Sequence, residues 1–288
     1  MRNAFKTAVL LAGLGALFML IGGAIGGTGG LVIGLGLGVV FCGGSYWFSD
    51  TMAIKAARAQ PVTQAQEPKL YAIVEDLARR EGMPMPRLYI SPEAQPNAFA
   101  TGRSPQHAAV CCTQGIMRVL DDDELRGVLA HELSHVKNRD ILIGSVAAAV
   151  AMGITFIARM AMWGALFTGG GRDGEGGNVF GALAMMILAP VAAALIQMSL
   201  SRSREYQADA SGARLLHDGE PLARALEKID IYSKQVPMNI APAEATAYII
   251  NPLAGRPNQG GGLSFANLFR THPPTADRVV RLRSGSWG

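Results

Sequence analysis

Residues 131–135 read His-Glu-Leu-Ser-His, the H-E-x-x-H pattern typical of the metal-binding helix of zinc hydrolases. Residues four apart lie on one face of a helix, so both imidazoles can reach a single ion. Glu132 is turned by about 100° from His131, and this places its carboxylate beside the ion as a general base, not as a ligand. The acidic run at 121–124 predicts that the helix begins there and continues past His135.

A catalytic zinc ion needs a third protein ligand, which has to come from another part of the chain. The stretch Ser-Arg-Ser-Arg-Glu-Tyr-Gln-Ala-Asp at 201–209 offers Glu205 and Asp209, four residues apart on one predicted helical face. One carboxylate could bind the ion while the other accepts a hydrogen bond from a ligand imidazole. The same spacing is also common on solvated helices, so the pair alone does not decide between the two interpretations.

Four apolar segments are each long enough to cross a bilayer, at 8–25, 31–48, 141–167 and 179–200. The first could also be a signal peptide, but a second span follows at once and favours a retained hairpin. Basic residues flank the outer ends of both pairs, at Arg2, Lys6, Lys55, Arg58, Lys137, Arg139, Arg202 and Arg204. The positive-inside rule then places both termini and the H-E-x-x-H helix in the cytoplasm.

The second pair of spans also bears on the third ligand. As a hairpin, it returns Glu205 to the helix that the chain leaves at Asp140, which favours Glu205 as the ligand. If the third ligand lies elsewhere, the reserve candidates are Asp140, Glu227 and His272. Arg159 interrupts the third segment, so whether this pair crosses fully stays open.

The expected fold is a mostly α membrane protein with four transmembrane helices and a cytoplasmic α+β domain that carries a small edge-exposed sheet. Its parts are a hairpin at 1–50, the N-terminal part of the cytoplasmic domain at 51–140, a second hairpin at 141–200 and the C-terminal part of that domain at 201–288. Soluble elements are predicted as helices at 67–80 and 221–232, strands at 87–90, 97–102 and 108–113, and a closing region at 265–283. Residues 238–262 are interpreted as a flap over the cleft or as a disordered segment.

Composition excludes several classes of function. The net charge of +4 comes with no aromatic-basic recognition module, which favours an anionic bilayer over nucleic acid as the partner. Three cysteines, Cys42 in a span and the adjacent Cys111 and Cys112, indicate neither a disulfide framework nor a catalytic thiol. The glycines at 22–38 lie in or between spans, so they indicate close helix packing and not a phosphate loop.

These features together resemble the HtpX family of membrane-bound zinc proteases, which is related to the CAAX prenyl proteases and other membrane gluzincins. The resemblance covers nearly the whole chain, without a departure at a ligand or catalytic position. It implies that the cytoplasmic α+β domain is a zincin-like (gluzincin) protease domain. Besides the four apolar segments and residues 131–135, the matching motifs are Asn-Arg-Asp at 138–140, Ser-Arg-x-x-Glu-Tyr-x-Ala-Asp at 201–209, Asn-Ala-Phe-Ala-Thr-Gly at 97–102 and Thr-His-Pro-Pro at 271–274.

The resemblance implies a role for each matching position. One zinc ion (Zn2+) per chain would have His131, His135 and Glu205 as ligands, with Glu132 as the base and later proton donor. Asp209 would orient a ligand histidine. Asn97, Ala98, Phe99 and Ala100 would form an edge strand that holds the substrate backbone, or else an ordinary edge strand. His272 would donate to the oxyanion or cap the chain before Pro273, and Arg278 would pair with a carboxylate near the zinc helix or lie on the surface.

The implied function is a zinc metalloendopeptidase of the bacterial inner membrane with its active site on the cytoplasmic side. Its substrates would be damaged or misassembled membrane proteins and unfolded proteins, cleaved in quality control and stress response alongside other membrane proteases. One alternative is a proteolytically inactive membrane scaffold that binds unfolded segments, but such a scaffold has no need of Glu132. A hydrolase of lipid or prenyl-linked substrates is a further alternative, and four spans are few for the chamber it would need.

Overall fold

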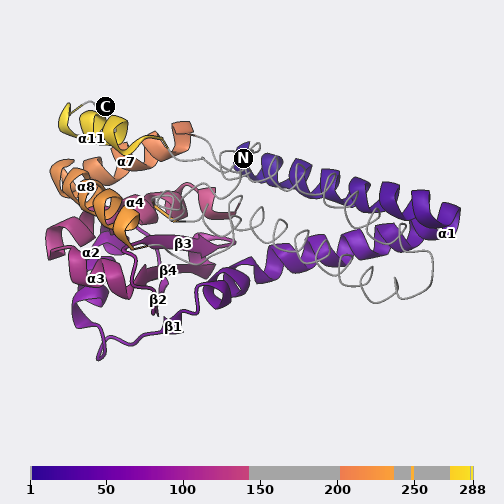
Figure 1. Ribbon diagram of the computed structural model, residues 1–288, viewed down its shortest axis with the longest axis horizontal. Coiled ribbons are helices and arrows are strands. Elements are labelled where there is room, and N and C mark those ends of the chain that lie inside the picture. The colour runs from indigo at the N-terminus through magenta and orange to yellow at the C-terminus, as the bar shows by residue number, and fades with distance from the viewer. Residues whose placement is uncertain (1, 143–201, 237–247, 250–272, 286, 288) are drawn as a thin grey trace.

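The fold consists of a body of helices packed on a small sheet and a long helical hairpin that extends away from it (Figure 1). The computed structural model describes residues 2–142, 202–236, 248–249, 273–285 and 287, and everything below refers to these. The hairpin is α1, Arg2–Ala56. The predicted spans at 141–167 and 179–200 fall almost entirely outside the described residues. His272 and most of the predicted flap at 238–262 also lie outside them.

Glycines allow α1 to fold back on itself. Gly27 has a φ of 58°, a left-handed conformation that glycine adopts without steric cost. A Cβ atom on Gly34 would lie 2.3 Å from the carbonyl oxygen of Phe18, and one on Gly38 would lie 3.3 Å from the Cα atom of Gly15. The two arms therefore approach to backbone contact, which confirms the packing role predicted for these glycines.

The apolar surface of α1 is largely uncovered. Within the described part of the chain, α1 is the one helix long and apolar enough to cross a membrane, over Gly27–Gly44. Its large exposed apolar side chains are Leu31, Val32, Ile33, Leu35, Leu37, Val39 and Val40, followed by Trp47 and Phe48. Near the body, the Arg103 guanidinium lies 4.7 Å from the centre of the Trp47 ring, and Arg87 Nη2 donates to Asp50 Oδ2 at 2.6 Å. The apolar stretch thus ends in charged and aromatic contacts with the body.

The sheet has four strands in the order β1-β2-β4-β3, which leaves β3 at an edge. The strands are β1 (Gln60–Pro61), β2 (Arg87–Ser91), β3 (Ala98–Gly102) and β4 (Ala108–Thr113). β2 runs parallel to β4, whereas β1 pairs with β2 and β3 pairs with β4 in antiparallel register. A short 3-10 turn, η1 (Pro105–His107), joins β3 to β4. The predicted small sheet is therefore present, with the predicted strand at 97–102 as its edge strand, but the residues of β3 are buried except for the half-buried Ala100.

Helices supply most of the body. They are α2 (Pro68–Arg80), α3 (Gln114–Val119), α4 (Asp122–Lys137), α7 (Arg202–Leu216), α8 (Glu220–Gln235) and α11 (Thr275–Arg283). The central one is α4, which contacts α2, α7, α8 and β3. Asp121 starts α4 in a capping box with Glu124, because each side chain accepts a hydrogen bond from the backbone N–H of the other.

The predicted elements differ from the observed ones mainly at their ends. The helix predicted at 67–80 begins at Pro68, because proline suits the first turn and Glu67 stays outside it as the N-cap. The helix predicted at 221–232 runs from Glu220 to Gln235, again with proline in its first turn. Asn97 precedes β3 and is not part of it. Of the closing region predicted at 265–283, the described part forms α11.

Candidate metal centre

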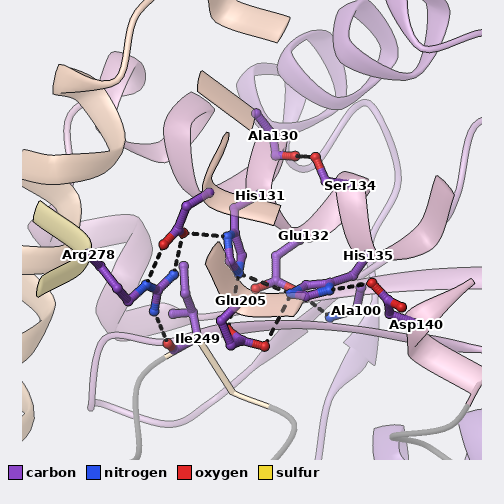
Figure 2. Close-up of polar contacts among 11 residues, drawn as sticks. Ala100, Ala130, His131, Glu132, Ser134, His135, Asp140, Glu205, Ile249 and Arg278 are labelled. Carbon is purple, nitrogen blue, oxygen red and sulfur yellow. Dashed lines mark hydrogen bonds and ion pairs between the residues drawn. The ribbon is translucent and has the colours of Figure 1, made fainter. Parts of the chain in front are cut away.

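Three potential metal ligands converge between α4 and α7. His131 and His135 come from one face of α4, and Glu205 comes from the first turn of α7 (Figure 2). One ligand atom from each residue lies within 4.8 Å of the other two. Two of the three residues are buried and His135 is half-buried, so an ion here would be shielded on most sides.

The spacing of these atoms fits a small tetrahedral ion. The two Nε2 atoms are 3.2 Å apart, and the Glu205 carboxylate oxygens lie 3.8 Å from His131 Nε2 and 3.6 Å from His135 Nε2. Ligands about 2.0–2.1 Å from a tetrahedral ion are roughly 3.3 Å apart. Two imidazole nitrogens and one carboxylate form a donor set that zinc accepts readily. The residues present therefore fit a zinc ion.

A carboxylate lies behind each imidazole. Asp209 Oδ1 is 2.9 Å from His131 Nδ1, and Asp140 Oδ2 is 3.4 Å from His135 Nδ1. Such a partner keeps the proton on Nδ1 and turns the lone pair of Nε2 toward the ion. Both rings are consequently oriented by the protein, with their Nε2 atoms facing the same point.

Arg278 completes the support on one side. Its side chain is 1% exposed, and it donates to both Asp209 oxygens, from Nε at 2.9 Å and from Nη2 at 2.7 Å. Burial alone would raise the pKa of Asp209, but the charge of Arg278 and the contact with His131 lower it to about 2. Asp209 is therefore a fixed anion between Arg278 and His131. Of the two interpretations of Arg278, the structure places it with the carboxylate and not on the surface.

Glu132 points from α4 toward the edge strand. Its Oε2 atom accepts a hydrogen bond from the Ala100 N–H at 2.9 Å, and the residue is 3% exposed. Burial raises the pKa of its carboxyl group to about 8, with Glu205 adding to the shift and the Ala100 N–H opposing it. A metal ion held by His131, His135 and Glu205 would lower this pKa, so that the carboxylate could take up a proton from water and give it back.

Close approach of α7 to α4 makes the cluster possible. A Cβ atom on Gly212 would lie 3.0 Å from the backbone nitrogen of His131, and Ala208 on the same helix is fully buried. Larger side chains there would push the helices apart, and Glu205 with them. The small residues of α7 therefore set the distance between Glu205 and the histidines.

Other predicted positions lie elsewhere. Asn97 is fully buried; its Oδ1 atom accepts from the Ala98 N–H at 3.1 Å and its own N–H donates to Thr113 Oγ1 at 2.9 Å. Asn97 therefore fixes the backbone at the start of β3 through hydrogen bonds inside the body. Glu227, a reserve candidate for the third ligand, forms an ion pair with Arg283 at the surface.

Sequence reasoning did not assign two contacts at the centre. From the sequence, Asp140 is only a reserve candidate for the third ligand, whereas the structure places it behind His135. Arg139, with a φ of 57°, turns the chain just after α4 and brings Asp140 back toward that helix. The bond between Ala100 and Glu132 depends on how β3 packs on α4, and no local pattern encodes it. For Asp140, the motif Asn-Arg-Asp directly after the helix was the available signal.

Comparison with known proteins agrees with this geometry. The family model described as Peptidase family M48 matches residues 64–286. A "Protease HtpX homolog" of Syntrophobacter fumaroxidans is 52% identical over 289 residues, covering 99% of this chain and 100% of that protein. Another of the same name from Burkholderia mallei (strain SAVP1) is 49% identical over 287 residues, covering 98% and 96%.

A solved structure has the same fold. The crystal structure of S. mikatae Ste24p superimposes with a TM-score of 0.51 at 20% identity, covering 98% of this chain and 64% of that one. The resemblance to HtpX inferred from the motifs is confirmed by the family match and by relatives that span the whole chain. The chain therefore belongs to peptidase family M48.

Proposed function

We propose that this chain is a membrane-bound zinc endopeptidase whose active site faces the cytoplasm and which cleaves damaged or misassembled membrane proteins. One observation carries the proposal: His131, His135 and Glu205 converge on one point, with Glu132 held between that point and a sheet edge. Membership of a peptidase family makes the chain a metalloprotease, and relatives of about half identical sequence are named as proteases.

In this proposal His131, His135 and Glu205 hold the zinc ion, which would supply the Lewis acidity that activates water and polarises the scissile carbonyl. Glu132 accepts a proton from the attacking water and later donates it to the leaving amine. The Ala100 N–H keeps the Glu132 carboxylate in position, and Asp209 and Asp140 keep the two imidazoles in the binding tautomer. Arg278 keeps Asp209 charged.

The substrate would bind as an added strand. The outer edge of β3 has no partner strand among the described elements, and it lies on the side of Glu132. An extended peptide can pair with such an edge through its backbone, which requires little of its sequence. That property suits an enzyme whose substrates share an unfolded state and not a motif.

Metal removal tests the endopeptidase activity. The purified chain in detergent micelles should bind one zinc ion per chain and cleave unfolded casein. Dialysis against a chelator should abolish cleavage, and added zinc should restore it. Metal analysis and gel assays of casein measure the two quantities. Zinc-loaded protein that leaves casein intact would support the scaffold alternative instead.

The membrane topology gives a separate prediction. Because basic residues flank the outer ends of the predicted spans, reporter fusions after Leu120 or Asp209 should read cytoplasmic. A fusion at Gly174, between the third and fourth spans, should read outside the cytoplasm. Paired alkaline phosphatase and green fluorescent protein fusions distinguish the two sides. A cytoplasmic signal at Gly174 would show that the second pair of spans does not cross, and would leave the metal site unaffected.

A further inference from the structure

The outer edge of β3 carries only a few backbone groups. Phe99 pairs with Cys111 of β4, and the Asn97 carbonyl accepts from the Thr113 N–H at 3.0 Å. In an antiparallel pair, alternate residues direct their backbone groups to the same side. The N–H and carbonyl groups of Ala98 and Ala100 therefore face outward. Asn97 Oδ1 accepts from the Ala98 N–H and Glu132 Oε2 accepts from the Ala100 N–H, so the two carbonyl groups are what this edge offers to a peptide that adds to β3.

A dipeptide of the chain already lies on this edge. The Ile249 N–H donates to the Ala98 carbonyl at 3.1 Å, and the Ile249 carbonyl accepts from Arg278 Nη1 at 2.9 Å. The Tyr248 ring packs edge-on against Phe99, with ring centres 5.1 Å apart. Tyr248 is 3% exposed and Ile249 is 1% exposed.

The two side chains of the dipeptide enter different hydrophobic clusters. Tyr248 joins a small cluster with Phe99, Cys111 and the end of α1, whereas Ile249 joins the main core. The Ile249 N–H thus makes, within the chain, one backbone hydrogen bond that an added substrate strand could make at the Ala98 carbonyl.

We propose that Tyr248–Ile249 is an internal occupant of the substrate's position on β3, so that the protease is latent until an extended peptide displaces it. The inference rests on the proposed function, because it takes the outer edge of β3 as the substrate site. If the dipeptide occupies the edge most of the time, only a fraction of the molecules can bind substrate. The apparent affinity for substrate is then the intrinsic affinity multiplied by that fraction.

Displacement would leave two hydrogen-bonding groups for the substrate to satisfy. The Ala98 carbonyl would lose its donor, and Arg278 Nη1 would lose its acceptor. A peptide backbone offers one N–H and one carbonyl per residue, and can therefore replace both contacts. Arg278 would keep its two bonds to Asp209 during the exchange, so the support of His131 would not depend on which strand is present.

Two substitutions weaken the occupant by different routes. Ile249→Pro removes the N–H that binds Ala98, and Tyr248→Ala removes the ring that packs on Phe99. Both should raise kcat/KM for casein. The increase should be about three- to tenfold if each substitution weakens the binding of the dipeptide to β3 by roughly the free energy of one hydrogen bond. Ile229→Ala is the control, because it truncates an equally buried residue of the main core on α8. It should lower Tm without raising kcat/KM.

Hydrogen exchange gives a measurement that does not depend on turnover. In a Glu132→Gln background, casein should add protection to residues 98–100 and remove it from residues 248–249. Protection at 248–249 that persists while 98–100 become protected would overturn the proposal, and so would exchange unchanged at both segments. A fall or no change in kcat/KM for both variants would also overturn it. The endopeptidase proposal fails by a different result, namely zinc-loaded wild type that does not cleave casein.

Discussion

Replacing Glu132 with glutamine should lower the rate of casein cleavage by about 10²- to 10⁴-fold, the range expected when a general base is removed. The amide keeps the shape of the side chain and can still accept the Ala100 N–H, but it cannot take up a proton at neutral pH. Because Glu132 is assigned as the base and not as a ligand, the variant should keep its zinc. Single-turnover rates and metal analysis on the same preparation measure both.

The same helix offers a matched control. Glu124 is also buried, at 1% exposed, but it binds the Lys228 ammonium at 2.6 Å and caps the start of α4. Glu124→Gln should lower Tm because it weakens the cap and the ion pair. The cleavage rate per bound zinc should stay within about twofold of wild type, since a cap acts on the stability of the helix. If Glu132→Gln lost its zinc together with activity, Glu132 would have to be reassigned as a ligand.

The central helix could be predicted from sequence because its determinants are local. Asp121 and Glu124 start it, apolar residues at helical spacing follow, and the two histidines lie one turn apart. The edge strand could also be predicted, since residues 97–102 and 108–113 read as a pair joined by a short connection. The predicted starts of two helices are wrong by one residue, where a proline sits in the first turn, and the predicted end of α8 is three residues short of Gln235.

Apart from the contacts of Glu205 and Asp209 with the histidines, contacts between elements could not be predicted, because they depend on how the helices and the sheet pack. Asp140 supports His135 only because the chain turns sharply at Arg139. Arg278 is far from Asp209 in sequence, and its spacing is equally compatible with an exposed helical face. Ile249 lies in a stretch rich in proline and glycine without periodicity, so nothing in the sequence indicated that it pairs with Ala98.

Replacing Glu205 with alanine should remove zinc almost completely under conditions in which wild type retains it. The remaining two imidazoles would leave the ion with too few protein ligands. The two reserve positions that the structure describes do not compensate: Asp140 faces the far nitrogen of the His135 ring, and Glu227 lies at the surface with Arg283. Cleavage of casein should be lost in parallel with the metal.

Replacing Asp209 with asparagine should have a smaller effect on the metal. Loss of a carboxylate behind a ligand histidine typically weakens metal binding about 10- to 100-fold. Asparagine keeps the shape of the side chain, so Arg278 keeps one acceptor, although it loses its charged partner. We therefore expect a lower Tm as well, and zinc binding has to be compared below that temperature.

Competition with a chelator, monitored by a zinc-sensitive dye, orders wild type, Asp209→Asn and Glu205→Ala from strongest to weakest binding. Glu227→Ala is the matched control, because it removes a glutamate whose described partner is a surface arginine, and it should leave zinc affinity unchanged. The reverse order of Asp209→Asn and Glu205→Ala would exchange the roles of the two carboxylates. If zinc affinity were unchanged in both variants, the third ligand could not come from α7. That result would contradict the assignment of Glu205, which among the described residues is the carboxylate nearest to both Nε2 atoms.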